Sequence, residues 1–211
     1  MSKALDLDTA ITAMRSGELV VYPTETYFAL GCMFNNVKAL EKVFALKKRP
    51  STSALPLIIG DMNQLETLTT KLPSAFDSFL MKLELFFWPG ALTVLFPAHA
   101  RVSSLITADS GEVGVRLSSH PQAKELAKRL GPLVASSANF SGESPVIDPE
   151  TLAPELLNAT AGYIIPRPKP AGLAPSTIIR PNGDASEFEI VRCGVVTPQR
   201  LKAAGFIVKD Y

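Results

Sequence analysis

The stretches VVYPTET (residues 20–26) and LVASSANFSG (residues 133–142) each begin as an apolar run and end in hydroxyl-bearing or amide side chains. Short apolar runs that stop at turn-forming residues are typical of buried strands. In an α/β sheet, ligands bind just beyond the carboxyl ends of the strands. The two stretches therefore predict a sheet with a polar pocket where these strands end.

The composition predicts a globular protein and argues against several other classes. Of the 211 residues, 46% are hydrophobic and 19% are charged, and the net charge is +1. A chain of this length can bury a full core, so we expect a single domain over residues 1–211. The near-zero charge argues against nucleic-acid binding through bulk electrostatic attraction, which leaves a local basic patch as the route to any RNA.

No membrane partner is expected, because lysine, glutamate or proline interrupts every apolar run before it could span a bilayer. The first residues lack the apolar core of a signal peptide. The chain has two cysteines, Cys32 and Cys193, which lack the spacing of metal ligands. These features predict a reduced, cytoplasmic setting.

Periodicity and turn signals predict an α/β fold in which helices and strands alternate. Expected helices cover residues 8–16, 37–46, 62–69, 74–87, 121–130, 148–157 and 198–204, and expected strands cover residues 18–22, 55–59, 92–96, 113–117, 133–136, 163–165, 177–180 and 187–192. Asp8 and Asp148 are predicted helix caps, and Pro56 predicts an edge position or a bulge. We expect residues 133–136 to form a central strand and residues 166–174 to be flexible.

Several catalytic classes are absent from the sequence. There is no phosphate-binding loop, no dinucleotide glycine fingerprint and no nucleophile elbow, and His99 and His120 are the only histidines. A side-chain nucleophile is therefore not expected. What remains is catalysis by positioning and charge neutralisation, which is what nucleotidyl transfer requires.

The candidate binding residues each have a simpler alternative. Lys48 and Arg49 suit phosphate binding, but they also suit a solvated charge cluster. Arg116 ends an apolar strand, where it would hold a carboxylate or form a surface ion pair. The serines of residues 136–141 would bind a ligand or form turns and caps. Glu25 would act as a base or as an ion-pair partner.

Three further residues have a structural interpretation. Trp88 more often fills a core than stacks on a base, and Cys32 is expected to be a small core residue. His120-Pro121 is expected to begin a helix, with the imidazole helping to fix the turn.

A series of short motifs follows one another along the chain: YPTET (22–26), KRP (48–50), WPG (88–90) with Thr93, VR (115–116) with HP (120–121), SSAN (136–139) with SG (141–142), PSTI (175–178) and RCG (192–194). Taken together and in this order, they resemble the YrdC-like family of L-threonylcarbamoyladenylate synthases. The resemblance covers about residues 18–194 and leaves a short C-terminal tail, as in the single-domain members of the family.

The resemblance implies a fold and a reaction. The family fold is an open, twisted, mixed parallel and antiparallel sheet with flanking helices around a central cavity. The implied enzyme is a nucleotidyltransferase that converts L-threonine, bicarbonate or CO₂, and ATP into threonylcarbamoyl-AMP and pyrophosphate. This product serves the threonylcarbamoyl-adenosine modification of tRNA position 37. Mg²⁺ would enter with the ATP phosphates, and no organic cofactor is implied.

The resemblance also assigns the site residues. The threonine site would comprise Thr24, Thr26, Arg116, Ser176 and Thr177. The ATP site would comprise Lys48, Arg49, Ser137, Asn139, Ser144 and Arg192. Two positions depart from the family: Ala29 replaces a common glycine, and Ile58 stands where many members carry a histidine that contacts threonine.

The partners that the resemblance implies are tRNA or double-stranded RNA and a downstream threonylcarbamoyl transferase complex. One alternative is a YrdC-like protein that binds RNA or nucleotide without synthase activity. Another is a double-stranded RNA-binding module, against which the near-neutral charge and the lack of an aromatic ladder argue. A third is carbamoyl transfer in metalloenzyme maturation, which would normally bring cysteine-rich zinc modules.

Overall fold

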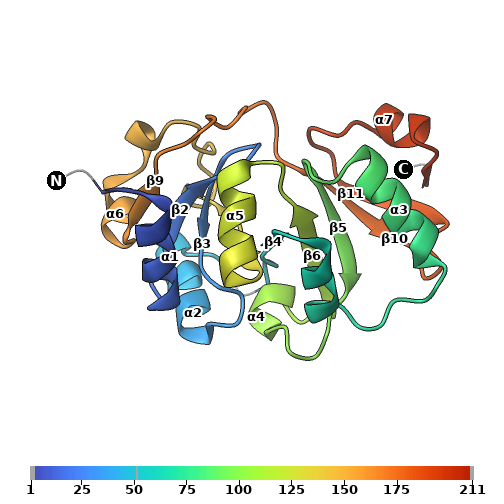
Figure 1. Ribbon diagram of the computed structural model, residues 1–211, viewed down its shortest axis with the longest axis horizontal. Coiled ribbons are helices and arrows are strands. Elements are labelled where there is room, and N and C mark those ends of the chain that lie inside the picture. Colours follow the sequence, from blue (N-terminus) through green and yellow to red (C-terminus); the bar gives the residue numbers. More distant parts are fainter. Residues whose placement is uncertain (1–2, 51, 210–211) are drawn as a thin grey trace.

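Two mixed β-sheets form the frame of the computed structural model, which describes residues 3–50 and 52–209 (Figure 1). The five-stranded sheet has the order β1 (Ala4–Leu5), β9 (Gly162–Ile164), β2 (Val20–Pro23), β3 (Phe28–Gly31), β8 (Ser136–Ser137). The seven-stranded sheet has the order β12 (Ile207–Val208), β11 (Glu187–Arg192), β10 (Thr177–Pro181), β5 (Leu92–Pro97), β6 (Glu112–Leu117), β4 (Leu57–Ile59), β7 (Leu133–Val134). Both sheets contain parallel and antiparallel pairs.

Helices flank both sheets. They are α1 (Leu7–Arg15), α2 (Val37–Lys47), α3 (Phe76–Phe86), α4 (Ser104–Thr107), α5 (Pro121–Leu130), α6 (Pro154–Asn158) and α7 (Pro198–Ala203), with 3₁₀ helices η1 (Met62–Thr67) and η2 (Pro149–Thr151). Figure 1 shows α1 and α6 at one end of the molecule, α3 and α7 at the other, and α5 between them. Helix α5 packs against β2 of one sheet and β4 of the other. No helix within the described ranges has both the length and the apolar character that a bilayer crossing needs.

The far end of the seven-stranded sheet is covered through an aromatic cluster. Phe79 of α3 stacks on Phe188 of β11, with ring centroids 5.1 Å apart. Phe206 lies edge-on to Phe79 and Phe87, and Phe96 of β5 packs tilted against Phe79. These rings are buried, so their packing fixes α3 against the sheet.

The two sheets meet at residues 133–137, which we call the seam. Val134 pairs with Leu57 of β4, whereas Ser136 and Ser137 pair with Leu30 and Ala29 of β3. The seam is fixed by the buried hydroxyl of Tyr22, which donates to the carbonyl oxygen of Val134 at 2.8 Å. One short segment of backbone thus serves as an edge strand in both sheets.

The structure confirms the predicted α/β class with mixed sheets and flanking helices, and it corrects the prediction for residues 133–136. They form two short strands at the edges of two sheets, not one central strand. The division occurs at Ala135, whose N–H donates to the carbonyl oxygen of Pro56 at 2.9 Å. Pairing with distant segments, not local propensity, therefore determines which strands form in this region.

Several element boundaries differ from the predictions. Helix α1 is capped by Asp6, whose Oδ1 accepts from Thr9 N at 2.7 Å, and not by Asp8. Pro56 precedes β4, which lies between β6 and β7, so the strand needs neither an edge position nor a bulge. The predicted helix over residues 148–157 is two pieces, η2 capped by Asp148 and α6 beginning at Pro154.

Other elements follow the predictions closely, while some short ones were missed. Helix α5 and strand β11 have the predicted bounds, and α3 stops before the Trp88-Pro89-Gly90 breaker. Residues 62–69 contain a 3₁₀ helix in place of an α-helix. The sequence analysis missed β1, β3, α4 and β12, which have only two to four residues each.

Gly31→Ala is expected to destabilise the fold because β3 passes against the seam at Gly31. A Cβ at this position would lie 2.1 Å from the Val134 carbonyl oxygen and 2.7 Å from Cε1 of Tyr22. Overpacking of this kind costs roughly 1–3 kcal/mol of unfolding free energy. Urea denaturation should show the loss, whereas the control Gly183→Ala, where a Cβ meets nothing within 4 Å, should not. Equal losses in both variants would contradict the seam as a close contact.

Candidate functional site

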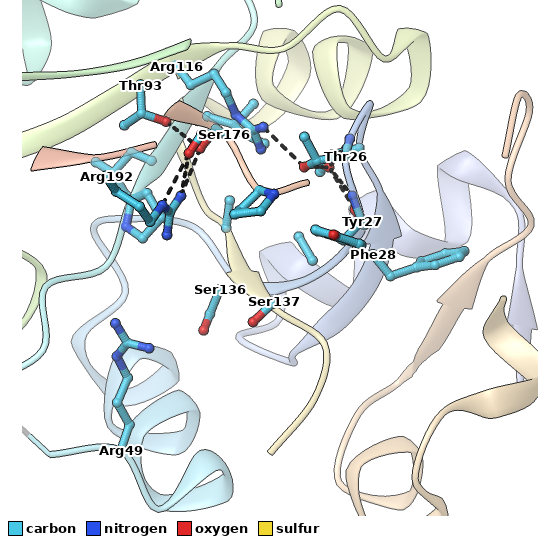
Figure 2. Close-up of a pocket in the computed structure, with 17 residues that line it drawn as sticks. Thr26, Tyr27, Phe28, Arg49, Thr93, Arg116, Ser136, Ser137, Ser176 and Arg192 are labelled. Atoms are coloured by element: carbon cyan, nitrogen blue, oxygen red, sulfur yellow. Dashed lines mark hydrogen bonds between the residues drawn. The ribbon is translucent and has the colours of Figure 1, made fainter. Parts of the chain in front are cut away.

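A cavity lies at the seam, where strand ends from both sheets meet (Figure 2). The cavity and its open mouth together hold about 640 Å³ of space not filled by atoms, part of which is bulk solvent. Its polar lining comprises Thr24, Thr26, Tyr27, Arg49, Thr93, Arg116, Ser136, Ser137, Ser176 and Arg192. Its apolar lining comprises Phe28, Ala29, Pro56, Leu57, Ile58, Ala135 and Pro175.

The cavity brings together most of the predicted site residues. The predicted residues that line it are Thr24, Thr26, Arg49, Arg116, Ser137, Ser176 and Arg192. Four others do not line it. Lys48 and Ser144 are exposed, and Asn139 is buried beside the seam with Nδ2 donating to Phe140 and Glu143 carbonyl oxygens. Thr177 is fully buried, and its hydroxyl donates to the Val196 carbonyl oxygen at 2.6 Å.

One wall of the cavity is built from hydroxyl groups and a buried arginine. Thr24 and Thr26 have their hydroxyl oxygens 3.1 Å apart. Arg116, at the end of β6, is 7% exposed and donates through Nη1 to Thr26 Oγ1 at 3.3 Å and to Glu25 Oε1 at 2.8 Å. A guanidinium held in this way is suited to a carboxylate ligand.

The next part of the wall comes from the start of β10 and the end of β11. The hydroxyl groups of Thr93 and Ser176 are 2.9 Å apart. Arg192 donates through Nη2 to the carbonyl oxygen of Ser176 at 2.8 Å and to its hydroxyl at 3.1 Å. Figure 2 shows Arg116, Ser176 and Arg192 on one side of the space, with Arg49 and the two seam serines on the other.

The cavity carries positive charge without acidic side chains in its lining. Arg49 is held by its own loop, donating to the carbonyl oxygens of Ser53 and Ala54 at 3.2 and 2.9 Å. Burial lowers the pKa of Arg49, and the pKa of Arg192 is lowered by burial and then by the charges of Arg116 and Arg49. Arg49 and Arg192 remain charged at neutral pH, because a guanidinium does not lose its proton in proteins. Within the described ranges, no aspartate or glutamate lines the cavity. Its electrostatics therefore suit an anion.

Lys47 was not among the predicted site residues, although its side chain is buried and that of Lys48 is exposed. Lys47 is 2% exposed, and its ammonium group donates to the carbonyl oxygen of Ser137 and lies 3.5 Å from its hydroxyl. Burial, and next the charge of Arg49, lower its pKa to about 8. Helical periodicity would have identified it, because Lys47 follows buried Val43 by four residues and Leu40 by seven.

Two orphaned polar atoms mark the seam side of the site. Ser136 is 3% exposed and lines the cavity, and its hydroxyl has no hydrogen-bond partner among the described residues. Oδ1 of Asn139, a residue that is 8% exposed, also has no hydrogen-bond partner among the described residues. Buried polar groups are nearly always satisfied in folded proteins. A polar ligand in the cavity would give the Ser136 hydroxyl its partner.

The structure decides between several of the alternative interpretations. Glu25 is an ion-pair partner of Arg116, and Arg116 is buried, not part of a surface pair. Trp88 is a core residue whose Nε1 donates to the Leu92 carbonyl oxygen at 2.7 Å. Cys32 is fully buried, which raises its pKa to about 12.

His120 is the N-cap residue of α5, as expected for the start of this helix, but its side chain makes no capping hydrogen bond. It is 2% exposed, and its Nε2 donates to the carbonyl oxygen of Pro168 at 2.9 Å. This contact ties α5 to residues 166–174, which also donate from Ala171 N and Gly172 N to the carbonyl oxygens of Glu25 and Thr26. The segment predicted to be flexible is thus hydrogen-bonded across one side of the site.

A family model, Sua5/YciO/YrdC, described as "Telomere recombination", matches residues 12–194. The chain belongs to the Sua5/YciO/YrdC family. A relative named threonylcarbamoyl-AMP synthase from Stenotrophomonas maltophilia is 37% identical over 193 residues, which are 90% of this chain and 99% of the relative. A protein of the same name from Bacillus subtilis is 33% identical over 92% of this chain and 55% of its own length.

Among solved structures, P. abyssi Sua5 complexed with L-threonine superposes with a TM-score of 0.85 at 27% identity. The alignment covers 96% of this chain and 58% of the P. abyssi chain. The chain therefore spans a little over half of two of these family members and nearly all of the third. Ala29 and Ile58, the two departures from the motifs of the family, both line the cavity.

His120 should make the stability of the protein depend on pH. Its pKa is lowered, mainly by burial, against the opposing effects of the Pro168 hydrogen bond and the Glu25 charge. Below the usual histidine pKa of about 6.5, the unfolded chain binds a proton that the folded chain does not. The unfolding free energy therefore decreases as the pH is lowered. Urea midpoints at several pH values should fall less steeply for His120→Gln, whose amide can still donate to Pro168.

His99→Gln is the matched control, because it removes the other histidine of the chain. The slope below about pH 6.5 should depart from that of the wild type more in His120→Gln than in His99→Gln. If His120→Gln shows the same slope as the wild type below about pH 6.5, burial of a neutral His120 is not the cause.

Proposed function

We propose that this protein makes threonylcarbamoyl-AMP from L-threonine, bicarbonate or CO₂, and ATP, and releases pyrophosphate. The observation that carries the proposal is the composition of a single cavity. The cavity combines hydroxyl groups and the ion-paired Arg116 with two further cations, Arg49 and Arg192, and with the seam serines. The names of the relatives and the L-threonine bound to P. abyssi Sua5 support this choice of substrates.

The amino acid is proposed to bind between Arg116 and the two threonines. The guanidinium of Arg116 would hold the carboxylate, and Thr24, Thr26 and Ser176 would surround the rest of the polar groups. Ala29 and Ile58 would supply apolar contact for the threonine methyl, because both face the cavity. Thr177 would support the site without contacting the ligand, because its hydroxyl holds the start of β10 against Val196.

ATP is proposed to bind with its phosphates between Arg49 and Arg192. The hydroxyl of Ser137 would donate to the phosphates. The ammonium group of Lys47, which lies against Ser137, would add a positive charge. We place Lys47 in the role first expected for Lys48, because Lys47 lies against Ser137 and Lys48 is exposed. Asn139 would support the Ser137 end of the seam, while Ser144 lies on the exposed loop beyond it.

Magnesium is proposed to enter with ATP as part of the substrate. Within the described ranges, no group of three or more histidine, cysteine, aspartate or glutamate side chains is placed to hold a metal ion. The phosphates would therefore supply the ligands, as in many ATP-using enzymes.

The chemistry then needs charge neutralisation and alignment. The uncharged threonine amine attacks the carbon of CO₂ and loses a proton to form a carbamate. A carbamate oxygen attacks the α-phosphorus of ATP, and the bond to the bridging oxygen breaks so that pyrophosphate leaves. Arg49, Arg192 and Lys47 would stabilise the charge that builds on the departing group. Fixing both substrates in one cavity supplies the alignment.

The product would serve threonylcarbamoyl-adenosine modification of tRNA, through a downstream threonylcarbamoyl transferase complex. Direct contact with tRNA or double-stranded RNA remains a prediction, as does a cytoplasmic location. The alternative is a family member that binds nucleotide or RNA without making the adenylate.

Pyrophosphate release is the test of the proposed reaction. It should require L-threonine, bicarbonate and magnesium-ATP together, and omission of any one should bring it to background. L-serine should be a poor substitute, because the lost methyl group is worth roughly 1–3 kcal/mol. ATP binding without threonine-dependent turnover would favour the alternative.

Lys47→Ala and Lys48→Ala form a matched pair that tests the assignment of Lys47. Loss of a charge-assisted contact costs about 1.5–3 kcal/mol, so Lys47→Ala should weaken ATP binding roughly tenfold to a hundredfold. Lys48→Ala should change it by less than about twofold, since an exposed charge is screened by solvent. Calorimetric titration with a non-hydrolysable ATP analogue measures both, and the reverse ranking would restore Lys48 to the site.

A further inference from the structure

Glu25 is a partly buried carboxylate that pairs with Arg116 beside the cavity but does not itself line the cavity. We infer that Glu25 is the positioning residue of Arg116, and that their pairing reserves this end of the cavity for a singly charged carboxylate. The inference rests on the proposed function and names a group to which that function assigns no role.

Both oxygens of the Glu25 carboxylate are engaged. Oε1 accepts from Arg116 Nη1 at 2.8 Å, and Oε2 accepts from the Ser118 hydroxyl. Ser118 is fully buried, and its hydroxyl oxygen in turn accepts from His120 N at 3.2 Å. The side chains of Arg116 and Glu25 are 9% and 16% exposed. The carboxylate is therefore fixed from two directions and mostly shielded from water.

The backbone that carries Glu25 is fixed as well. The hydroxyl of Thr24 accepts from the N–H groups of Thr26 and Tyr27 at 3.2 Å each, which closes the turn. On its other side, Ala171 N donates to the Glu25 carbonyl oxygen at 3.3 Å and Gly172 N donates to that of Thr26 at 2.9 Å. A rigid turn holds a rigid carboxylate, so the guanidinium it binds has little freedom to rotate.

This geometry determines which edge of Arg116 remains for a ligand. Every hydrogen bond that the Arg116 side chain makes to the described residues uses Nη1, to Glu25 and to Thr26, and Nε and Nη2 donate to none of these residues. An arginine that is anchored at one corner presents its remaining donors in a fixed fork, which is the arrangement that binds a carboxylate with two hydrogen bonds.

The pairing also divides the charge of the cavity. Arg49 and Arg192 donate to carbonyl and hydroxyl oxygens and have no carboxylate partner among the described residues. The positive charge of Arg116 is balanced by the negative charge of Glu25 in an ion pair. A polyphosphate with several negative charges is therefore drawn to Arg49 and Arg192, which face each other across the cavity, whereas Arg116 is left to the amino acid (Figure 2).

Glu25→Gln tests the inference, because the amide keeps the shape of the side chain and removes its charge. L-threonine affinity, measured by calorimetric titration, should fall about tenfold as a charge-assisted contact to Arg116 is lost. The affinity for a non-hydrolysable ATP analogue should change by less than about twofold. Inorganic pyrophosphate should also become a stronger competitor of L-threonine in Glu25→Gln than in the wild type.

A double-variant comparison separates positioning from a general structural effect. If Glu25 acts through Arg116, Glu25→Gln should add little further loss of threonine affinity to Arg116→Lys. Independent structural damage would give additive losses instead. The control is Glu112→Gln, which breaks another arginine–carboxylate pair, with Arg180 at 2.9 Å, away from this cavity. It should leave threonine affinity unchanged.

The outcomes distinguish this inference from the proposed function. If the wild type binds threonine and Glu25→Gln binds it equally well, the role of Glu25 is overturned and the proposed function stands. Equal losses for threonine and the ATP analogue, or additive losses in the double variant, would also overturn it. A wild type that binds no threonine would overturn the proposed function itself.

Discussion

The close approach of the seam to β2 and β3 is the constraint on which the rest of the structure depends. The Val134 carbonyl oxygen fits between the Tyr22 hydroxyl, which donates to it, and Gly31, which has no side chain to block it. This contact lets residues 133–137 leave the seven-stranded sheet and join the five-stranded one within three residues. Strand ends of both sheets then face the same space, and the cavity lies there.

The seam also explains how arginines from separate elements can act on two substrates in one cavity. Arg49 comes from the loop after α2, Arg116 from β6 and Arg192 from β11, and each is anchored by its own local contacts. Lys47 joins the first of these groups to the seam through the Ser137 carbonyl oxygen. Because each cation is held before a ligand arrives, little reorganisation is needed when charge builds on the phosphates.

Local signals in the sequence predicted the elements that local forces determine. Helix α5 has a proline at its first turn, a glycine after its last and a clear apolar face, and its bounds were predicted correctly. The division into two sheets was not predictable in this way, because it depends on which distant strands pair at Ala135. The cap of α1 was also predicted wrongly, because the fold uses Asp6 and not Asp8.

The site followed the same rule. Thr26, Arg116 and Ser137, expected in the site from the family resemblance, do line the cavity, because each lies at a strand end or in the turn that follows one. Lys47 was missed because the end of α2 places adjacent lysines in opposite environments, and Lys48 has already turned out with a φ of 49°. Thr177 and Asn139 belong to the right motifs, but their side chains are used for hydrogen bonds within the protein.

A crystal structure of the protein with L-threonine and a non-hydrolysable ATP analogue tests the central claim most directly, namely that one cavity at the seam holds both substrates. The account predicts the threonine carboxylate on Arg116, the phosphates between Arg49 and Arg192, and the threonine nitrogen facing the α-phosphate. Threonine bound away from Arg116, or the two ligands in separate pockets, would contradict it.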